Sequence, residues 1–348
     1  MKKTREIDYL FLTNSLSGGG AERAINIAVN QIAKKGIKVG LIAINAGPQD
    51  LFAPKVPTFE INRAWQGGPL TLLKAYISTY IVICRIRPQR IILNCDLPEF
   101  LGAFIFGPWK ITVVEHVPKP WSDRLRLGQF IRKVLKARRV EWVKVSDHLQ
   151  PWLSGTNLAT HIPNAISENG TLGAAKHKAG QNIERLVFIG RLTKAQKQPH
   201  WMLDIAELSK KELVFFGDGL YRKDLELEAL RRGLTVDFQG FVTNPWDLMK
   251  PNDLLVIPSA WEGDGLVVVE ALSRNIPTIL NKVGDLTRFE LPDKHYCSGV
   301  KEFVERINQN EKDLPSLIAG SEFSEKLSQS RNPELVASKW IEYLTKVK

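Results

Sequence analysis

The amino-acid sequence predicts an α/β protein made of two doubly wound domains. The chain has 348 residues, about twice the usual size of a single domain. Short β-rich runs alternate with longer helical patterns, which is typical of βαβ units and parallel sheets. This alternation is interrupted at 163–184, a segment rich in Gly, Ala and Asn and poor in large apolar residues. We interpret this segment as a linker.

The first half opens with a buried strand followed by an amphipathic helix at 21–34. Strands are expected at 7–14, 39–45, 90–94, 111–115 and 142–146. We assign residues 1–165 to an N-terminal domain.

The alternation restarts after the linker. Strands are expected at 186–190, 212–216, 236–240, 254–258 and 277–280, and helices at 200–210, 221–232 and 266–274. We assign residues 166–329 to a C-terminal domain and expect a helix at about 330–348 to pack back on the first. Two such domains would face each other across a cleft, with ligands at the carboxyl ends of the strands.

The composition excludes several classes of protein. Hydrophobic residues make up 44% and charged residues 24%, as in ordinary globular chains. Cys84, Cys95 and Cys297 form no close pair, which argues against a disulfide framework and fits a reducing cytoplasm. The apolar runs 75–84 and 100–109 are shorter than the ~20 residues that span a bilayer. We therefore expect a soluble cytoplasmic chain.

The charge is unevenly distributed. Residues 1–165 hold 23 Lys and Arg against 11 Asp and Glu, a balance of +12. The remaining residues hold 25 against 26, a balance of −1. The N-terminal half is therefore expected to meet something anionic, such as a membrane surface, a nucleic acid or a phosphorylated substrate. The alternative is a solvated basic face without a partner.

A glycine-rich turn, Ser-Gly-Gly-Gly-Ala-Glu at 17–22, follows the first strand and opens a helix. Gly18 and Gly19 would let the backbone approach a donor closely, and the helix N-terminus offers N–H groups to an anion. The turn matches neither a P-loop nor a GxGxxG motif. A tight strand–helix turn is the alternative explanation.

Two cations follow the first strand of the C-terminal domain, in the segment Gly-Arg-Leu-Thr-Lys-Ala-Gln-Lys at 190–197. Arg191 can bind diphosphate oxygens with its fork, and Lys197 can act as a point charge. Surface cations in a loop are the alternative.

The segment 253–272 contains a buried strand that ends at Pro258, a glycine-rich turn and a helix beginning near Gly265. Glu262 and Glu270 lie eight positions apart, about 12 Å if the whole span were helical. The spacing suits a nucleotide sugar, with one carboxylate at the sugar and the other at the ribose. Between them, first-turn N–H groups would hold the diphosphate. The alternative is two solvated acids beside a buried helix. The first-turn residues in question are Gly265, Leu266 and Val267.

Together with VSDHL at 145–149 and IPNAI at 162–166, these motifs resemble the family 4 retaining glycosyltransferases of the bacterial envelope polysaccharide and lipopolysaccharide type. The resemblance covers nearly the whole chain. It implies the GT-B fold, in which two Rossmann-like domains face each other across a cleft.

The resemblance also implies residue roles. Arg191 and Lys197 would clamp the donor diphosphate, Glu262 would contact the donor sugar and Glu270 the ribose. His116 would reach the transferred sugar. Arg191, Lys197, Glu262 and His116 are thus the candidate catalytic residues. The family needs no metal or other cofactor, and two cations with a helix dipole could stabilise the leaving diphosphate.

The sequence departs from the family pattern at two positions. Asp264 replaces an aromatic residue and is expected either to cap the following helix or to hydrogen-bond a sugar hydroxyl. Gln198 replaces a glycine after Lys197. These departures leave the identity of the donor open.

A basic amphipathic helix is predicted at 124–139, with apolar residues at Leu127, Phe130, Ile131, Val134 and Leu135. The segment carries seven basic residues and no acid between its ends. One hypothesis is a face that meets anionic lipid or the acceptor. The alternative is a helix packed on the core with a solvated basic side. The residues assigned to the membrane or acceptor face are Arg124, Arg126, Arg132, Lys133 and Lys136.

The leading hypothesis is a retaining, metal-independent transferase. It would move a hexosyl or N-acetylhexosaminyl unit from a nucleotide diphosphate sugar, with UDP favoured, to a lipid-linked or lipopolysaccharide-type glycan. The protein would be cytoplasmic and peripheral on the inner face of the cell membrane. The alternatives are a non-catalytic sugar-nucleotide binder and a nucleic-acid-binding protein that uses the basic domain. Since no known nucleic-acid motif is present, we expect no nucleic-acid partner.

Overall fold

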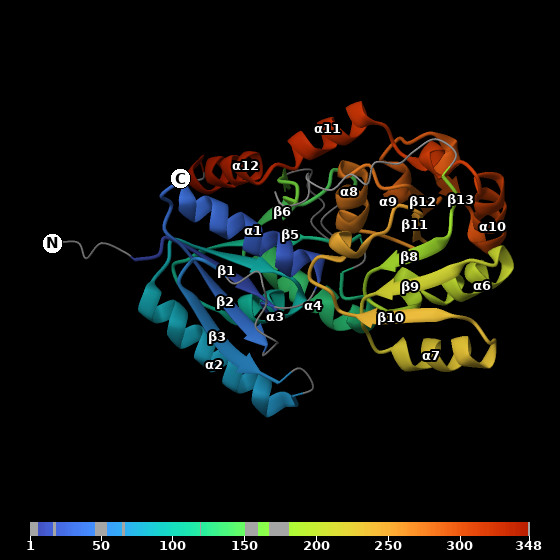
Figure 1. Cartoon of the computed structure of the whole chain (residues 1–348). Helices are drawn as coiled ribbons and strands as arrows, with labels where there is room; N and C mark the ends of the chain where they lie inside the picture. Colours follow the sequence, from blue (N-terminus) through green and yellow to red (C-terminus); the bar gives the residue numbers. More distant parts are fainter. Residues whose placement is uncertain are drawn as a thin grey trace. The chain divides into compact units, whose positions relative to one another are not determined.

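The computed structural model describes residues 6–16, 19–45, 54–64, 67–118, 120–149, 159–166 and 181–346. Two compact units are present (Figure 1). Unit 1 comprises residues 1–167 and 331–348, and unit 2 comprises residues 168–330. The boundaries expected from the sequence lie after residues 165 and 329.

Unit 1 is built on a seven-stranded parallel sheet in the order β3-β2-β1-β4-β5-β6-β7. Strands β2 and β4 pair on either side of β1. This is the doubly wound arrangement, which gathers ligand-binding loops at the carboxyl ends of the strands. The strands are β1 (Tyr9–Thr13), β2 (Val39–Asn45), β3 (Thr58–Arg63), β4 (Arg90–Asn94), β5 (Lys110–Glu115), β6 (Glu141–Lys144) and β7 (Thr160–His161).

Helices cover both faces of this sheet. Phe11 of β1 packs in one core with α1 and α12, while Leu10 and Leu12 point to the opposite core beneath α2, α3 and α4. This follows from the alternation of side chains along a strand. Trp340 of α12 meets Phe11 edge to face at 5.6 Å. The helices are α1 (Gly20–Lys34), α2 (Pro69–Ile86), α3 (Asp96–Phe104), α4 (Leu125–Ala137) and α12 (Pro333–Lys346), with the short helix η1 (Ser122–Arg124).

Unit 2 is built on a six-stranded parallel sheet in the order β10-β9-β8-β11-β12-β13. In its core, Phe215 of β9 stacks on Phe238 of β10 and meets Phe188 of β8 at a tilt of 59°. The strands are β8 (Arg185–Ile189), β9 (Glu212–Phe216), β10 (Val236–Gly240), β11 (Asp253–Ile257), β12 (Thr278–Asn281) and β13 (Tyr296–Cys297). The helices are α5 (Lys194–Lys197), α6 (His200–Ser209), α7 (Arg222–Arg231), α8 (Leu266–Ser273), α9 (Gly284–Thr287), α10 (Gly299–Gln309) and α11 (Ser321–Ser330), with η3 (Pro245–Leu248), η4 (Asp293–His295) and η5 (Leu314–Leu317).

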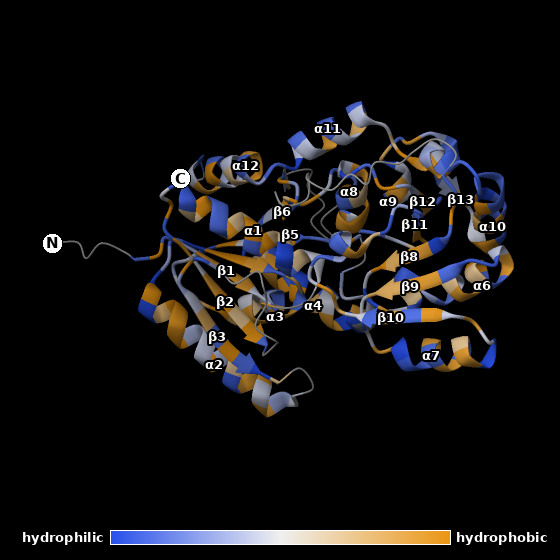
Figure 2. Cartoon of the chain, in the orientation of Figure 1, coloured by the Kyte–Doolittle hydropathy of each residue, from blue (hydrophilic) through white to orange (hydrophobic). Residues whose placement is uncertain are grey.

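The predicted fold class, two Rossmann-like α/β domains, is confirmed. Figure 2 shows apolar strands in both sheets, as expected for parallel sheets with helices on both faces. The helix that contains the apolar run 75–84 is longer than this run. Among the described residues, α2 alone is long and apolar enough to cross a membrane by length and composition. It extends past the apolar run 75–84 in both directions, and it packs against β2 and β3.

Candidate active site

The carboxyl edge of the unit 2 sheet is drawn together by glycines. Gly190 follows β8, Gly217 follows β9, and both have a φ of +154°. A Cβ at Gly217 would lie 1.9 Å from the carbonyl oxygen of Gly190, so only glycine fits this close approach. Arg191 leaves the sheet at this point with an exposed side chain, and it makes no ion pair within the described ranges.

The loop after β8 reaches the loop after β11. The backbone N–H of Ala260 donates to the carbonyl of Gln196 at 2.8 Å. Lys197 Nζ lies 2.6 Å from Glu262 Oε1, and these side chains are only 15% and 8% exposed. The structure therefore brings two predicted site residues into direct contact. A diphosphate reaching Lys197 would compete with the Glu262 carboxylate.

The turn that carries Glu262 and Asp264 is held from the neighbouring α9 segment. Asp285 Oδ2 accepts from the backbone N–H of Glu262 at 3.2 Å. Arg288 Nη2 donates to the carbonyl of Asp264 at 2.5 Å and lies 3.3 Å from its carboxylate Oδ1. The sequence hypotheses for Asp264 named a helix cap or a sugar hydroxyl, and neither anticipated Arg288.

Helix α8 begins at Leu266, after Gly265 in the left-handed conformation with φ +59°. Glu262 therefore lies ahead of the helix, and the 12 Å separation calculated for a fully helical span does not apply. The first-turn N–H groups of Leu266 and Val267 have no intrahelical acceptor, as at any helix N-terminus. Together with the helix dipole, they make a positive end that suits an anion.

Glu270 lies in α8 and is buried. Its Oε2 accepts from the indole N–H of Trp246 at 2.9 Å. The guanidinium of Arg274 lies 5.0 Å from the Trp246 ring centroid and donates to the Glu270 carbonyl. Trp246 was not predicted as a site residue, because it lies 24 positions before Glu270 in the short helix η3, which has no recognisable motif.

In unit 1, His116 directly follows β5 and lies beside the end of β4. Its Nε2 is 2.5 Å from Asn94 Oδ1. Because Asn94 Nδ2 donates to Thr13 Oγ1 at 3.2 Å, its Oδ1 accepts, and His116 carries its proton on Nε2. Burial lowers the pKa of His116 to about 4, so the ring is neutral at neutral pH and Nδ1 has a lone pair.

The glycine-rich turn is described only in part. Gly18 lies outside the described residues, while Gly19 precedes α1 as its N-cap. A Cβ at Gly19 would come within 3.1 Å of Glu22 Oε2. The Glu22 carboxylate in the first turn of α1 therefore lies close to Gly19. A donor anion at this turn would meet a negative charge.

The basic face predicted on α4 needs one correction. Arg132 is buried, with its side chain 1% exposed, and is not a membrane or acceptor contact. Its guanidinium lies 2.7 Å from Glu99 Oε1 and 2.5 Å from Glu115 Oε2, and its Cζ lies 5.1 Å from the Trp142 ring centroid. The other residues assigned to that face are exposed: Arg124, Arg126, Lys133 and Lys136.

Within the described ranges, no group of three or more His, Cys, Asp or Glu side chains is placed to hold a metal ion. The metal-free mechanism stays a prediction. A surface hollow lined by residues of β6, β7 and α12 contains none of the predicted site residues.

The family model of glycosyl transferases group 1 matches residues 174–329, which include Arg191, Lys197, Glu262 and Glu270. A Campylobacter jejuni relative, GalNAc-alpha-(1->4)-GalNAc-alpha-(1->3)-diNAcBac-PP-undecaprenol alpha-1,4-N-acetyl-D-galactosaminyltransferase, is 23% identical over 313 residues, 82% of each chain. The putative glycosyltransferase EpsF of Bacillus subtilis is 30% identical over 181 residues. That match covers 46% of this chain and 47% of EpsF.

Solved structures match over almost the full length. HepE of Anabaena in complex with UDP-glucose has a TM-score of 0.78 at 21% identity, covering 97% of this chain and 99% of that one. WaaG, a glycosyltransferase involved in lipopolysaccharide biosynthesis, has a TM-score of 0.73 at 13% identity, with coverage of 97% and 99%. The chain thus has the GT-B fold, and its residues 174–329 match the family model of glycosyl transferases group 1.

Proposed function

We propose that this protein is a retaining, metal-independent glycosyltransferase. It transfers a hexosyl or N-acetylhexosaminyl unit from a UDP-sugar to a lipid-linked or lipopolysaccharide-type glycan. The observation that carries the proposal is the contact of Lys197 with Glu262 beside the exposed Arg191, at the carboxyl edge of the group 1 domain.

The donor diphosphate binds Arg191 and Lys197. Arg191 is exposed and offers its fork to phosphate oxygens. Lys197 exchanges the Glu262 carboxylate for a phosphate oxygen, which leaves Glu262 to accept from hydroxyls of the donor sugar. Negative charge grows on the leaving diphosphate in the transition state, where two cations and the α8 N-terminus stabilise it.

The ribose hydroxyls donate to Glu270. The Trp246 indole fixes the orientation of this carboxylate through Oε2. A carboxylate has about four lone-pair sites, so an oxygen already engaged can accept a further hydrogen bond. Trp246 is therefore a positioning residue for nucleotide binding.

His116 accepts a hydrogen bond from a hydroxyl of the transferred sugar. Its neutral ring and its Nδ1 lone pair suit it to accept a hydrogen bond rather than to act as a cation. Support for the substrates comes from relatives: HepE structures contain UDP-glucose or UDP, and the name of the Campylobacter relative includes an undecaprenol-linked glycan. A peripheral location at the membrane would bring such an acceptor within reach.

A donor screen with the full chain tests the proposal. Thermal shift and nucleotide release are measured with UDP- and GDP-sugars, before and after EDTA. We expect UDP to stabilise the protein and EDTA to leave turnover unchanged. Stabilisation by GDP alone, or turnover that needs an added divalent ion, would contradict the corresponding part of the proposal. Tight binding to duplex DNA without any effect of UDP-sugars would favour the nucleic-acid alternative.

Substitution of Lys197 isolates its role. Lys197→Met removes the cation and should lower kcat by about 10²-fold or more, because the Lys197 ammonium acts mainly on the charge that develops on the leaving diphosphate. Lys194→Met is the matched control, since it lies in the same short helix with its ammonium over the Tyr221 ring, 5.5 Å away. Equal losses in both variants would show that general positive charge, and not this contact, matters.

A further inference from the structure

Helix α2 presents a row of large apolar side chains to solvent. Leu70, Leu73, Ile77 and Ile81 are 75%, 54%, 47% and 43% exposed. Their spacing of three and four residues places them on one face of the helix. A helix on the surface of a globular protein normally presents charged and polar residues there. A continuous exposed apolar row of this kind marks an interaction surface.

The opposite side of α2 is already occupied. Ala75, Thr79 and Ile83 are buried, and the helix packs against β2 and β3 at the edge of the unit 1 sheet. The outer row is therefore not needed for the core. Because α2 is fixed lengthwise on the sheet, the folded unit can offer this helix to a bilayer only in the plane of the interface.

The charge around the apolar row has one sign. Residues 61–95 contain no Asp or Glu, and they contain five Lys and Arg residues. Lys74, Arg85 and Arg87 among them are exposed. An apolar row with cations and no acid is complementary to an anionic lipid surface. Two copies joined through this face would bring like charges together, which opposes such pairing.

An aromatic loop extends the apolar row towards α4. Phe106, after α3, is 63% exposed, and its carbonyl accepts from Tyr80 of α2 at 3.2 Å. The guanidinium of Arg138, at the end of α4, lies 5.0 Å from the Phe106 ring centroid. Trp109 meets Tyr80 edge to face at 6.2 Å. Tyr and Trp are enriched where protein meets the lipid headgroups.

The three helices form one layer. Buried side chains of α2, α3 and α4 belong to the same core cluster on one face of the unit 1 sheet (Figures 1 and 2). The exposed cations of α4 are therefore on the same side of unit 1 as the apolar row of α2. The apolar row of α2 and the cations of α4 can therefore contact one flat partner at the same time.

We propose that the apolar row of α2 and the Phe106 loop insert into the headgroup region of an anionic bilayer, with the exposed cations of α4 contacting lipid phosphates. This inference deepens the peripheral membrane location within the proposed function. It moves the main contact from the basic helix α4 to the apolar helix α2. Binding should therefore keep a component that salt does not screen.

Vesicle co-sedimentation of the full chain tests this surface. The vesicles contain either phosphatidylglycerol with phosphatidylethanolamine or phosphatidylcholine alone, at about 0.1 M and about 0.5 M salt. The first variant combines Leu70→Gln, Leu73→Gln and Ile77→Gln, which keeps helix propensity while removing the apolar row. We expect its partition coefficient to fall at least about tenfold at both salt levels.

Two matched variants separate the contributions. Leu227→Gln with Leu230→Gln removes exposed apolar side chains of α7 in unit 2, 66% and 78% exposed, and should bind as the wild type does. Arg126→Gln with Lys133→Gln should weaken binding at the lower salt level only. Circular dichroism and melting curves check that each variant is folded.

The proposal is overturned if the α2 variant sediments like the wild type, or if the wild type binds to neither vesicle type. A wild-type dimer that the α2 variant abolishes, without vesicle binding, would assign this face to a second copy instead. Thermal shift by UDP on the same samples keeps the two proposals apart. Vesicle binding that depends on α2, without a thermal shift by UDP, would support the membrane surface and contradict the proposed transferase function.

Discussion

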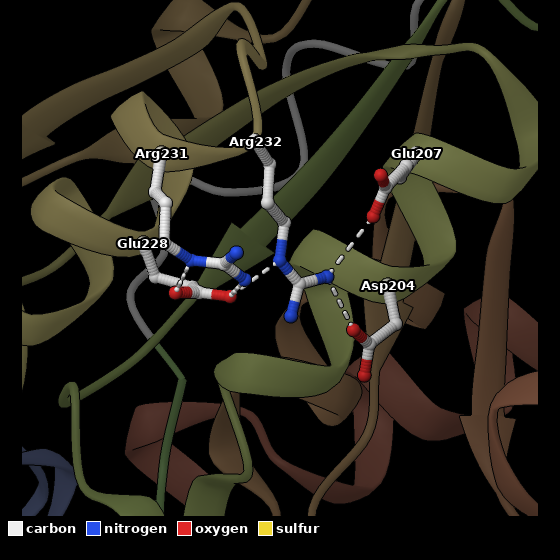
Figure 3. A network of polar contacts seen from close by, with 5 residues as sticks. All are labelled: Asp204, Glu207, Glu228, Arg231 and Arg232. Atoms are coloured by element: carbon white, nitrogen blue, oxygen red, sulfur yellow. Dashed lines mark hydrogen bonds and ion pairs between the residues drawn. The ribbon is translucent and has the colours of Figure 1, made fainter.

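Each unit contains an arginine held by several carboxylates, and the two clusters differ in burial. In unit 1, Arg132 lies between Glu99 and Glu115, with all three side chains at most 2% exposed. In unit 2, Arg232 joins carboxylates of α6 and α7, and its side chain is 23% exposed (Figure 3). The groups around Arg232 are Asp204, Glu207, Glu228 and the neighbouring Arg231.

Burial, and not the number of ion pairs, decides how much such a cluster contributes to the free energy of unfolding. In the solvated network, water and salt screen each contact, and a pair is worth about 0–1 kcal/mol. In the buried cluster, loss of one partner leaves an uncompensated charge without water, which costs about 3–5 kcal/mol.

The buried cluster also has a functional position. Glu115 is the last residue of β5 and His116 follows it directly. Arg132 on α4 and Glu99 on α3 thus fix the strand end that carries the proposed sugar contact. The network around Arg232 ties two helices of unit 2 together and includes none of the predicted site residues.

The largest expected effect is that of Arg132→Met. The variant leaves Glu99 and Glu115 buried and facing each other without a cation, so unit 1 should lose about 3–5 kcal/mol of unfolding free energy. Urea unfolding followed by tryptophan fluorescence measures this loss, since Trp142 lies beside the guanidinium. The control is Lys133→Met, an exposed neighbour on the same helix. A loss no larger than that of the control would mean that water reaches the cluster.

The second prediction concerns pH. Burial and the neighbouring Glu99 raise the pKa of Glu115 to about 7, although Arg132 opposes this. The folded state therefore binds this proton more tightly than the unfolded state. The resulting stability is present below pH ~4.5 and is lost as pH rises through ~7, on the order of 1–3 kcal/mol. Unfolding free energies between about pH 5 and 8 should fall in the wild type and become flatter in Glu115→Gln.

The exposed network should show the opposite sign. Hydrogen bonds from Arg231 and Arg232 lower the pKa of Glu228 to about 2. Its contribution is present above pH ~4.5 and fades as pH falls towards 2. A Glu115→Gln variant whose pH dependence equals that of the wild type would contradict the assignment of the neutral-pH slope to unit 1.

The sequence predicted the regular parts of both sheets well. Strands at 39–45, 90–94, 212–216 and 236–240 occur with the predicted bounds. These strands are short apolar runs bounded by turn residues, a local signal. The edge strand β3 was missed because it is only half-buried, and α2 because it is apolar on both sides and so lacks a clear helical period.

Contacts between distant positions could not be predicted. On α4 the apolar period placed Phe130 in the core and Arg132 on the surface, yet Phe130 is 54% exposed and Arg132 is buried. The partners that hold Arg132 lie 17 and 33 positions earlier in the chain. In unit 2, Lys197 and Glu262 were selected by motif, but their contact spans 65 positions and became visible only in the fold.

The smallest expected effect is that of Arg232→Ala. Three carboxylate contacts within 4 Å would suggest a strong clamp between α6 and α7 by simple counting, because Nη1 and Nε reach oxygens at 2.6 Å to 3.1 Å. The guanidinium is partly solvated, however, and Arg231 remains to pair with Glu228. We therefore expect a loss of only about 1 kcal/mol or less at low salt, which shrinks further at about 1 M salt. Urea unfolding of the variant at both salt levels, with Arg231→Ala as the solvent-exposed control, measures this difference. A salt-independent loss as large as that of Arg132→Met would show that the number of ion pairs, and not their burial, sets the stability of such clusters.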